Sequence, residues 1–172
     1  MRASSTNFLR WKLKTREKTA TPPASSGSTR TARSQATTLT YLYACIGAPA
    51  KTQRYVSKVM NELYNNTSSG YAGNEDCGQM SSWYVFGSMG FYPVNPVGGE
   101  YVLGAPLLEE AVVTLPKGKT FAVKAHRTSP DEIYVQSVTL NGKPHKEIFI
   151  RHEDIMRGGT LELKMGKKKG SF

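Results

Sequence analysis

The spacing of apolar residues changes near Tyr101, and this change separates a helical part of the chain from a β part. Between residues 51 and 63 apolar side chains recur at the period of an amphipathic helix. After residue 101 apolar and polar residues alternate in short segments rich in β-branched and aromatic side chains, which is typical of half-buried strands. The sequence therefore predicts an α+β fold in which helices precede a small antiparallel β region.

Two to three helices are expected before residue 100. One ends in the apolar segment Leu39–Ile46, after which Gly47 and Pro49 interrupt it. The next, Lys51–Leu63, carries the amphipathic stripe and has Thr52 as a candidate cap.

The last helical segment runs from about Cys77 to Met89. Asp76 is its candidate N-cap, and Gln79 stands three residues later at the capping-box position. Gly90 stands where many helices end in a glycine. A loop containing two acidic residues is thereby expected at the N-terminus of a helix.

Five short segments in the second half have the composition and alternation of strands. These segments are residues 109–115, 120–126, 132–140, 146–151 and 160–165. Asn141-Gly142 follows the third segment, and Asn-Gly is the dipeptide most typical of a two-residue hairpin turn. They predict an antiparallel sheet or small sandwich.

The N-terminal 38 residues differ in composition from the rest. They contain eight Lys or Arg residues against the single acid Glu17, and so hold +7 of the formal net charge of +10. The segment matches no nucleic-acid-binding motif, and its low hydrophobicity favours a disordered basic tail. We therefore divide the chain into residues 1–38, residues 39–100 with the helices, and residues 101–172 with the strands.

Several classes of protein are excluded or left open by composition. No apolar run reaches about 18 residues, so neither a transmembrane span nor a membrane partner is expected. The N-terminus lacks the apolar core of a secretory signal. Cys45 and Cys77 are too few for a disulfide framework; they could pair or stay free, and we expect buried thiols. Residues 65–68 contain two overlapping glycosylation sequons, which matter for a secreted chain.

The run Asn74-Glu75-Asp76 places an amide and two carboxylates just before the last helix. The N-terminus of a helix favours the ionised form of a nearby carboxylate. An ionised carboxylate can act as a general base or bind a hard cation. Asn74 and Gln79 add amide groups suited to sugar hydroxyls or to Ca²⁺. The same run fits an ordinary helix cap, and spacing alone does not separate these alternatives.

A series of short sequence motifs resembles glycoside hydrolase family 92. The motifs are Tyr41-Leu42-Tyr43, residues 49–53 (PAKTQ), 73–86 (GNEDCGQMSSWYVF), 90–93 (GFYP), 104–107 (GAPL), 134–142 (YVQSVTLNG), 152–155 (HEDI) and 158–161 (GGTL). They occur in the order of the family's C-terminal section. The resemblance implies that the helices are the end of an α/α toroid.

The resemblance also implies an activity. Members of the family are inverting exo-α-mannosidases that use Ca²⁺ to release mannose from N-glycan or mannan chains. It implies Asp76 as the general base and a calcium ligand, with Glu75 as the second candidate base, and Asn74 and Gln79 as substrate-binding residues. The expected partner is a mannose-containing oligosaccharide with an α-1,2 linkage, not a nucleic acid, and the expected location is extracytoplasmic.

The chain also departs from the family pattern. The family's general acid, a glutamate, and its N-terminal β-sandwich lie upstream of the matching region. Where relatives have Gly-Asn-Glu-Pro, this chain has residues 33–38 (RSQATT), which suggests that residues 1–38 are a foreign or out-of-frame segment. We expect an incomplete enzyme that is inactive alone; the alternative is a noncatalytic carbohydrate-binding remnant.

Overall fold

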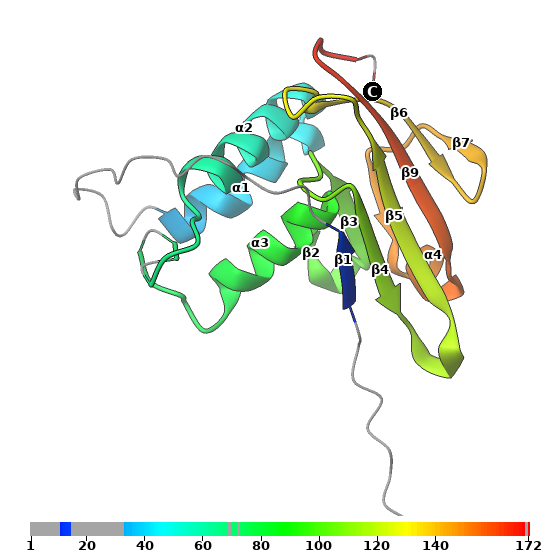
Figure 1. The fold of residues 1–172 in the computed structure, drawn as a ribbon, viewed down its shortest axis with the longest axis horizontal. Helices are drawn as coiled ribbons and strands as arrows, with labels where there is room; N and C mark the ends of the chain where they lie inside the picture. Colours follow the sequence, from blue (N-terminus) through cyan, green and yellow to red (C-terminus); the bar gives the residue numbers. More distant parts are fainter. Residues whose placement is uncertain (1–10, 15–32, 69, 72, 171) are drawn as a thin grey trace, which may run out of the picture.

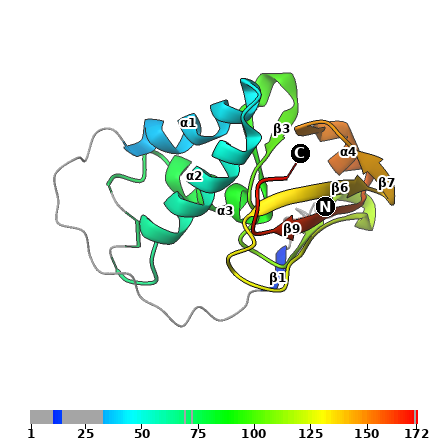
Figure 2. The ribbon, with the colours of Figure 1, turned by 90° about the horizontal axis from the view of Figure 1, so that it is seen from above.

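The computed structural model describes residues 11–14, 33–68, 70–71, 73–170 and 172. The three helices at residues 33–45, 49–62 and 79–89 form one side of the molecule, and the strands form the other, together with a short helix at residues 152–157 (Figure 1). From above, the same three helices again lie to one side of the strands (Figure 2). The predicted α+β class is confirmed. None of the helices in these ranges is long and apolar enough to cross a membrane.

Three helices make up the helical side, namely α1 (Arg33–Cys45), α2 (Pro49–Glu62) and α3 (Gln79–Met89). The buried Thr52 joins the first two, because its hydroxyl accepts a hydrogen bond from Ala44 N at 2.9 Å and donates one to the Thr40 carbonyl at 2.8 Å. The prediction that Thr52 caps its helix was wrong. The helix begins earlier, at Pro49, since proline lacks an N–H that would need a partner in the first turn.

Aromatic and sulfur-containing side chains fill the space between the helices. The buried residues of this helical core are Tyr41, Ala44, Val56, Met60, Tyr64, Met80, Trp83 and Val102. Trp83 is fully buried, so it packs in the core and does not offer a face to a sugar. Val102 lies on a strand, and the helical core therefore extends to the sheets.

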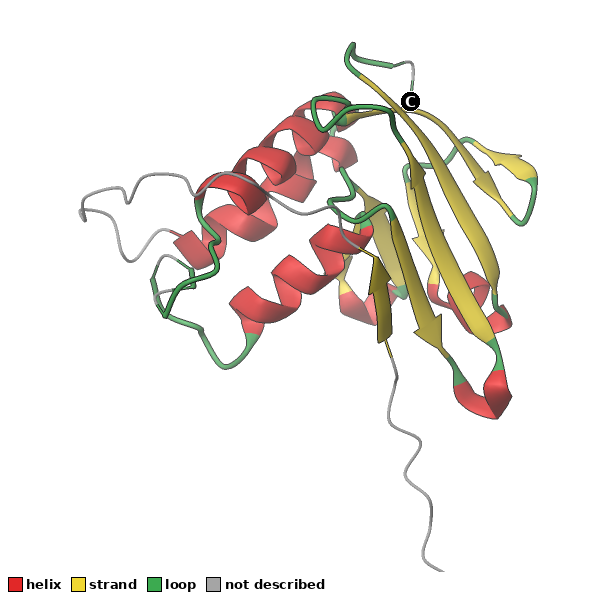
Figure 3. Ribbon diagram, viewed as in Figure 1, coloured by secondary structure: helices red, strands yellow, loops and turns green. Residues whose placement is uncertain are grey.

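Two sheets make up the other side (Figure 3). The larger has the strand order β1-β4-β5-β9-β6-β7 and the smaller β2-β3-β8. The strands are β1 (Trp11–Lys14), β2 (Phe91–Asn95), β3 (Glu100–Leu103), β4 (Glu110–Thr114), β5 (Thr120–His126), β6 (Tyr134–Leu140), β7 (Lys143–His145), β8 (Phe149–Arg151) and β9 (Gly159–Gly166). Helix α4 (His152–Arg157) and the short 3-10 turns Pro96–Gly98 and Pro116–Gly118 complete the described elements. Side chains of both sheets share one core, which includes Phe91, Leu103, Phe121, Val135, Ile150 and Leu161.

All five predicted strand segments contain a strand. The predicted hairpin is confirmed: Leu140 pairs with Lys143, and the two residues between them, Asn141 and Gly142, have φ values of 53° and 77°. Both positive values are those of a type I′ turn. The strand pairing is not purely antiparallel, as the sequence had suggested, because β9 pairs with β5 in parallel and with β6 antiparallel. The chain reaches β9 only after passing through β6, β7, β8 and α4, so β9 can run in the same direction as β5.

Two segments within residues 1–38 have regular structure where the sequence predicted a disordered tail. Strand β1 pairs antiparallel with β4 from Trp11↔Val113 to Lys14↔Glu110. Helix α1 already begins at Arg33. Backbone pairing on an open strand edge depends little on side-chain hydrophobicity, which explains why composition gave no sign of β1. Residues 1–10 and 15–32 lie outside the described residues.

Candidate functional site

The acidic run lies in a tight loop that leads into α3. Asp76, Cys77 and Gly78 have φ values of 54°, 57° and 89°, so three consecutive residues are left-handed. A residue with a Cβ is disfavoured there by roughly 1–2 kcal/mol. Such backbone persists only where its surroundings hold it in place.

Asp76 does not cap the helix, contrary to the prediction. Gly78 is the N-cap residue, the helix begins at Gln79, and no side chain caps it at that position. Glu75 takes part in this role instead, because its Oε1 accepts a hydrogen bond from Ser81 N at 3.0 Å. The left-handed backbone turns the chain so that Glu75, and not Asp76, faces the first-turn N–H groups.

Backbone hydrogen bonds reinforce the same turn. Met80 N donates to the Glu75 carbonyl at 3.1 Å, and Gln79 N donates to the Asp76 carbonyl at 3.2 Å. The backbone of both acidic residues is thereby tied to the first turn of α3.

The Glu75 carboxylate has a second neighbour in Tyr71. The Tyr71 hydroxyl, followed by the Ser81 amide, lowers the pKa of Glu75 below its ordinary value. The same carboxylate raises the pKa of Tyr71. The Oε2 atom of Glu75 is shielded from solvent and has no hydrogen-bond partner among the described residues, and this desolvation opposes the lowering of the pKa without reversing it. Glu75 is therefore kept ionised and held in place by protein groups. Tyr71 and Ser81 were missed by the sequence analysis, since neither stands at a helical spacing that links it to Glu75.

Tyr71 lies beside a cluster of aromatic rings. Tyr64 stacks on Tyr84 with ring centroids 4.6 Å apart and on Trp83 at 5.8 Å, and it lies 6.3 Å from the Tyr71 ring. The Tyr64 hydroxyl donates to the Met80 carbonyl at 3.0 Å. Burial raises the pKa of Tyr64 well above its ordinary value, so this hydroxyl stays protonated. The loop thus rests on the helical core.

The other predicted site residues lie beside Glu75 along the same loop. The Asp76 and Asn74 side chains are exposed. The Asp76 carboxylate makes no hydrogen bond and no ion pair with any other residue that the structure describes. Gln79 is half-buried, and its Nε2 lies 3.5 Å from Thr38 Oγ1. The structure therefore brings the four predicted residues together on one short segment, with one exposed carboxylate.

The side chains of this segment offer few of the ligands that calcium needs. Ca²⁺ takes six to eight oxygen ligands. Among the described residues there is no group of three or more His, Cys, Asp or Glu side chains placed to hold a metal ion. The Glu75 carboxylate is already engaged, which leaves Asp76, Asn74 and Gln79 as the side chains that offer oxygen atoms. This segment alone does not form a calcium site.

The expectation of buried thiols was wrong. Cys45 and Cys77 are both free and exposed. Cys77 stands on the left-handed turn, whose side chains point away from the core, and Cys45 is the last residue of α1.

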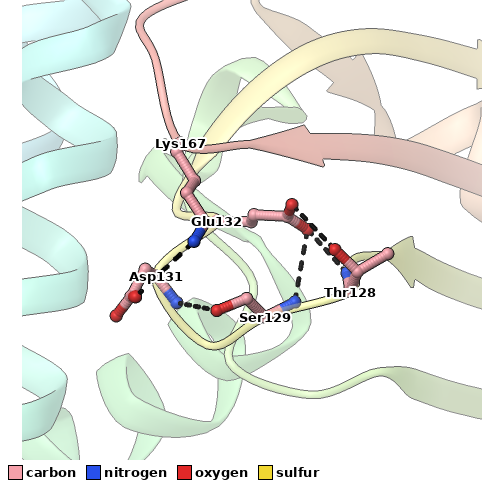
Figure 4. Close-up of polar contacts among 5 residues, drawn as sticks. All are labelled: Thr128, Ser129, Asp131, Glu132 and Lys167. Carbon is pink, nitrogen blue, oxygen red and sulfur yellow. Dashed lines mark hydrogen bonds and ion pairs between the residues drawn. The ribbon is translucent and has the colours of Figure 1, made fainter.

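A second acidic group lies between β5 and β6, far from this loop along the chain (Figure 4). The Glu132 carboxylate accepts hydrogen bonds from Thr128 N at 2.6 Å, Thr128 Oγ1 at 3.0 Å and Ser129 N at 3.4 Å. The Nζ atom of Lys167 lies 4.0 Å from Oδ2 of Asp131. Contacts within the loop occupy Glu132, so this carboxylate stabilises the connection and is not free to act as a base.

Two shallow hollows also lie on the strand side. One is lined by Glu109, Glu110, Lys124, Ala125, His126, Arg127 and Thr128, and the other by residues around β7 and α4. Neither includes a residue from 74 to 79. They do not extend the acidic loop into a larger site.

Comparisons with known proteins find relatives of one kind. The sequence model of the glycosyl hydrolase family 92 catalytic domain matches residues 10–167. This range begins within residues 1–38, the segment that the sequence pattern set apart from the family. A curated relative, an uncharacterized secreted glycosidase of Arthroderma benhamiae, is 36% identical over 136 residues, which make up 77% of this chain and 18% of that protein.

Two solved structures from Bacteroides thetaiotaomicron are similar in sequence and in fold. A family GH92 inverting mannosidase is 43% identical with a TM-score of 0.72, over 77% of this chain and 18% of its own. A family GH92 α-mannosidase in complex with mannoimidazole is 35% identical with a TM-score of 0.74, over 78% and 18%. The chain thus spans 18% of the length of each of these three relatives.

Proposed function

The chain belongs to glycosyl hydrolase family 92, and on this basis we propose that it is part of an inverting exo-α-mannosidase. Its substrate is a mannose-containing oligosaccharide of the N-glycan or mannan type, with an α-1,2 bond as the first candidate linkage. The observation that carries the proposal is the acidic loop before α3, in which Asp76 is exposed while its neighbour Glu75 is engaged. The inverting relative, 43% identical, supports the same mechanism.

Asp76 is the proposed general base. In an inverting glycosidase one carboxylate activates the water that attacks the sugar ring, and it must be ionised and accessible. Asp76 meets the second requirement because it is exposed. Glu75 is the weaker candidate, since its carboxylate already accepts a hydrogen bond from Ser81 N. We assign Glu75 the task of positioning the turn that carries Asp76, and Asn74 and Gln79 the task of binding sugar hydroxyls.

The acid that must assist the leaving group is proposed to come from outside this sequence. General acid catalysis contributes on the order of two to four powers of ten to the rate. We therefore expect no measurable turnover from these 172 residues alone. A noncatalytic carbohydrate-binding role is the second candidate, because the loop has only one carboxylate that is not engaged by the described part of the protein.

Calcium and location are further parts of the proposal. Asp76 and Asn74 are the donors that this chain would contribute to a Ca²⁺ site, with the remaining ligands supplied from elsewhere in the enzyme. Calcium would supply a positive charge that orients sugar hydroxyls. The secreted fungal relative supports an extracytoplasmic location.

A chimera tests the proposed activity. Residues 39–167 of this chain would replace the matching segment of the 43% identical bacterial mannosidase, and mannose release from an α-1,2-linked mannobiose would be measured. We expect an active chimera, a loss of at least about 100-fold in kcat for D76N, and loss of activity with EDTA that Ca²⁺ restores. An active chimera in which D76N retains full kcat would refute the assignment of the base. Robust release by the 172-residue chain alone would refute the view that it is incomplete.

A further inference from the structure

The loop before the acidic turn contains two overlapping sequons that the proposed function does not use. They are Asn65-Asn66-Thr67 and Asn66-Thr67-Ser68. A sequon becomes an acceptor for an N-linked glycan when the chain enters a eukaryotic secretory route and the asparagine lies in a surface loop. We propose that Asn65 is such a glycosylation site, an inference that rests on the secretion proposed above.

The loop is closed at its base and open at its tip. Tyr64 and Tyr71 form an isolated antiparallel bridge, and Asn65 N donates to the Gly70 carbonyl at 2.7 Å. Gly70 N donates to the Thr67 carbonyl at 2.9 Å. All four side chains from residue 65 to residue 68 are exposed. A glycan attached here would extend into solvent without displacing a core side chain.

The geometry distinguishes the two sequons. The Thr67 hydroxyl donates a hydrogen bond to Asn65 Oδ1, so the acceptor side chain and the hydroxyl two residues later lie on the same side of the loop. For Asn66 the corresponding hydroxyl is that of Ser68, and the described contacts include no hydrogen bond between these two side chains. Because adjacent asparagines leave little room for two glycans, we infer that one is modified and that it is Asn65.

The reaction requires a lipid-linked oligosaccharide and its transferase. The Asn65 Nδ2 attacks C1 of the first sugar, the new N–C bond forms, and the C1–O bond to the lipid pyrophosphate breaks. The pyrophosphate leaves with the bonding electrons, and the amide nitrogen loses one proton to a base of the transferase. The side-chain amide remains neutral, and no oxidant or reductant is needed.

Expression of the full 172-residue chain behind a secretory leader in yeast tests the site. Gel mobility before and after treatment with a peptide-N-glycosidase, which cleaves the glycosylated side-chain amide and leaves aspartate, would be measured on whole-cell extract and medium, so that retained chain is also counted. Peptide mass spectrometry would then locate the asparagine converted to aspartate. We expect one glycan on the parent chain and on N66Q and T67S. We expect no glycan at Asn65 in T67A, which removes the sequon of Asn65 but keeps that of Asn66, because Ser68 is unchanged. T67A is thus a matched control for modification at Asn66.

Two results would overturn the proposal. One is a parent chain that enters the secretory route, as shown by cleavage of the leader, but carries no glycan. The other is a glycan on the parent chain that maps to Asn66 and not to Asn65. Because the leader is supplied, neither result depends on the mannosidase activity, which the chimera tests separately.

Discussion

The two adjacent carboxylates of the acidic loop have different surroundings. Glu75 accepts a hydrogen bond from Ser81 N and lies beside the Tyr71 hydroxyl. Asp76 is exposed on left-handed backbone. One carboxylate therefore stabilises the turn, while the next is free to meet water or a ligand. This division follows from the turn itself, since consecutive side chains on it cannot face the same group.

Substitutions at these two positions should affect stability differently. We expect E75A to lower the melting temperature, because the Ser81 N–H loses its acceptor and the left-handed turn loses a support. We expect a smaller decrease for E75Q, whose side-chain carbonyl can still accept that hydrogen bond. D76N should melt like the parent. Thermal melts at pH 7 followed by far-UV circular dichroism would measure this; equal losses in E75A and D76N would contradict it.

Acid should remove part of the stability through two depressed carboxyl groups. Tyr71 and Ser81 lower the pKa of Glu75, and the Thr128 amide, followed by its hydroxyl, lowers that of Glu132. A group whose pKa is depressed on folding contributes stability above its unfolded pKa, near 4.5, and loses it as the pH falls through the folded pKa. Urea melts between pH 7 and pH 3 should therefore show a decline that is shallower in the E75Q/E132Q double variant. An unchanged slope would show that other carboxyl groups dominate.

At the level of elements, the periodicity of apolar residues predicted the type of most helices and strands, but it did not predict how distant strands pair. The amphipathic stripe before Leu63 and the alternation after Tyr101 gave the right element types, and Asn141-Gly142 gave the right turn. Strand β1 and the parallel pairing of β9 were not predictable in this way, because both depend on contacts between distant parts of the chain. In the site, the sequence pattern selected residues 74–79 but assigned the helix cap to Asp76 in place of Glu75. The misassignment arose because capping signatures assume an ordinary backbone at residues 76 and 77.

Thr52 offers a test of how α1 and α2 are joined. T52V keeps the shape of the side chain but leaves the buried Ala44 N–H and Thr40 carbonyl without the Thr52 hydroxyl as partner. We expect a loss of about 1–3 kcal/mol in the free energy of unfolding. T52S retains the hydroxyl and serves as the control, with a smaller loss. Equilibrium urea denaturation would measure both, and a T52V variant as stable as the parent would show that the hydrogen bonds contribute nothing net.

At the level of the whole molecule, the helical and strand cores meet at Tyr41. This ring lies close to two glycines: a Cβ added at Gly104 would come within 2.9 Å of it, whereas one added at Gly87 would remain 3.4 Å from its hydroxyl. Gly104 N also donates to the Gly90 carbonyl at 2.8 Å, which ties the segment after β3 to the end of α3. The two cores should therefore unfold together.

The two glycines make a matched pair of substitutions. We expect G104A to lower the free energy of unfolding by about 1–3 kcal/mol, because the added methyl group would overlap the Tyr41 ring. G87A lies inside α3 and should be neutral or stabilising by up to about 1 kcal/mol. Tryptophan fluorescence and far-UV circular dichroism should give coincident urea transitions for the parent chain. Two separate transitions, or a neutral G104A, would contradict the shared unfolding.

The position of β9 has a consequence for synthesis on the ribosome. Residues 159–166 lie between β5 and β6 in the larger sheet, yet they are translated after both. The β4–β5 and β6–β7 pairs join neighbouring segments and can form as the chain emerges. Their inner edges stay unpaired until β9 leaves the exit tunnel and inserts between them. During that interval the nascent chain exposes two strand edges, and this is when a chaperone would be of most use.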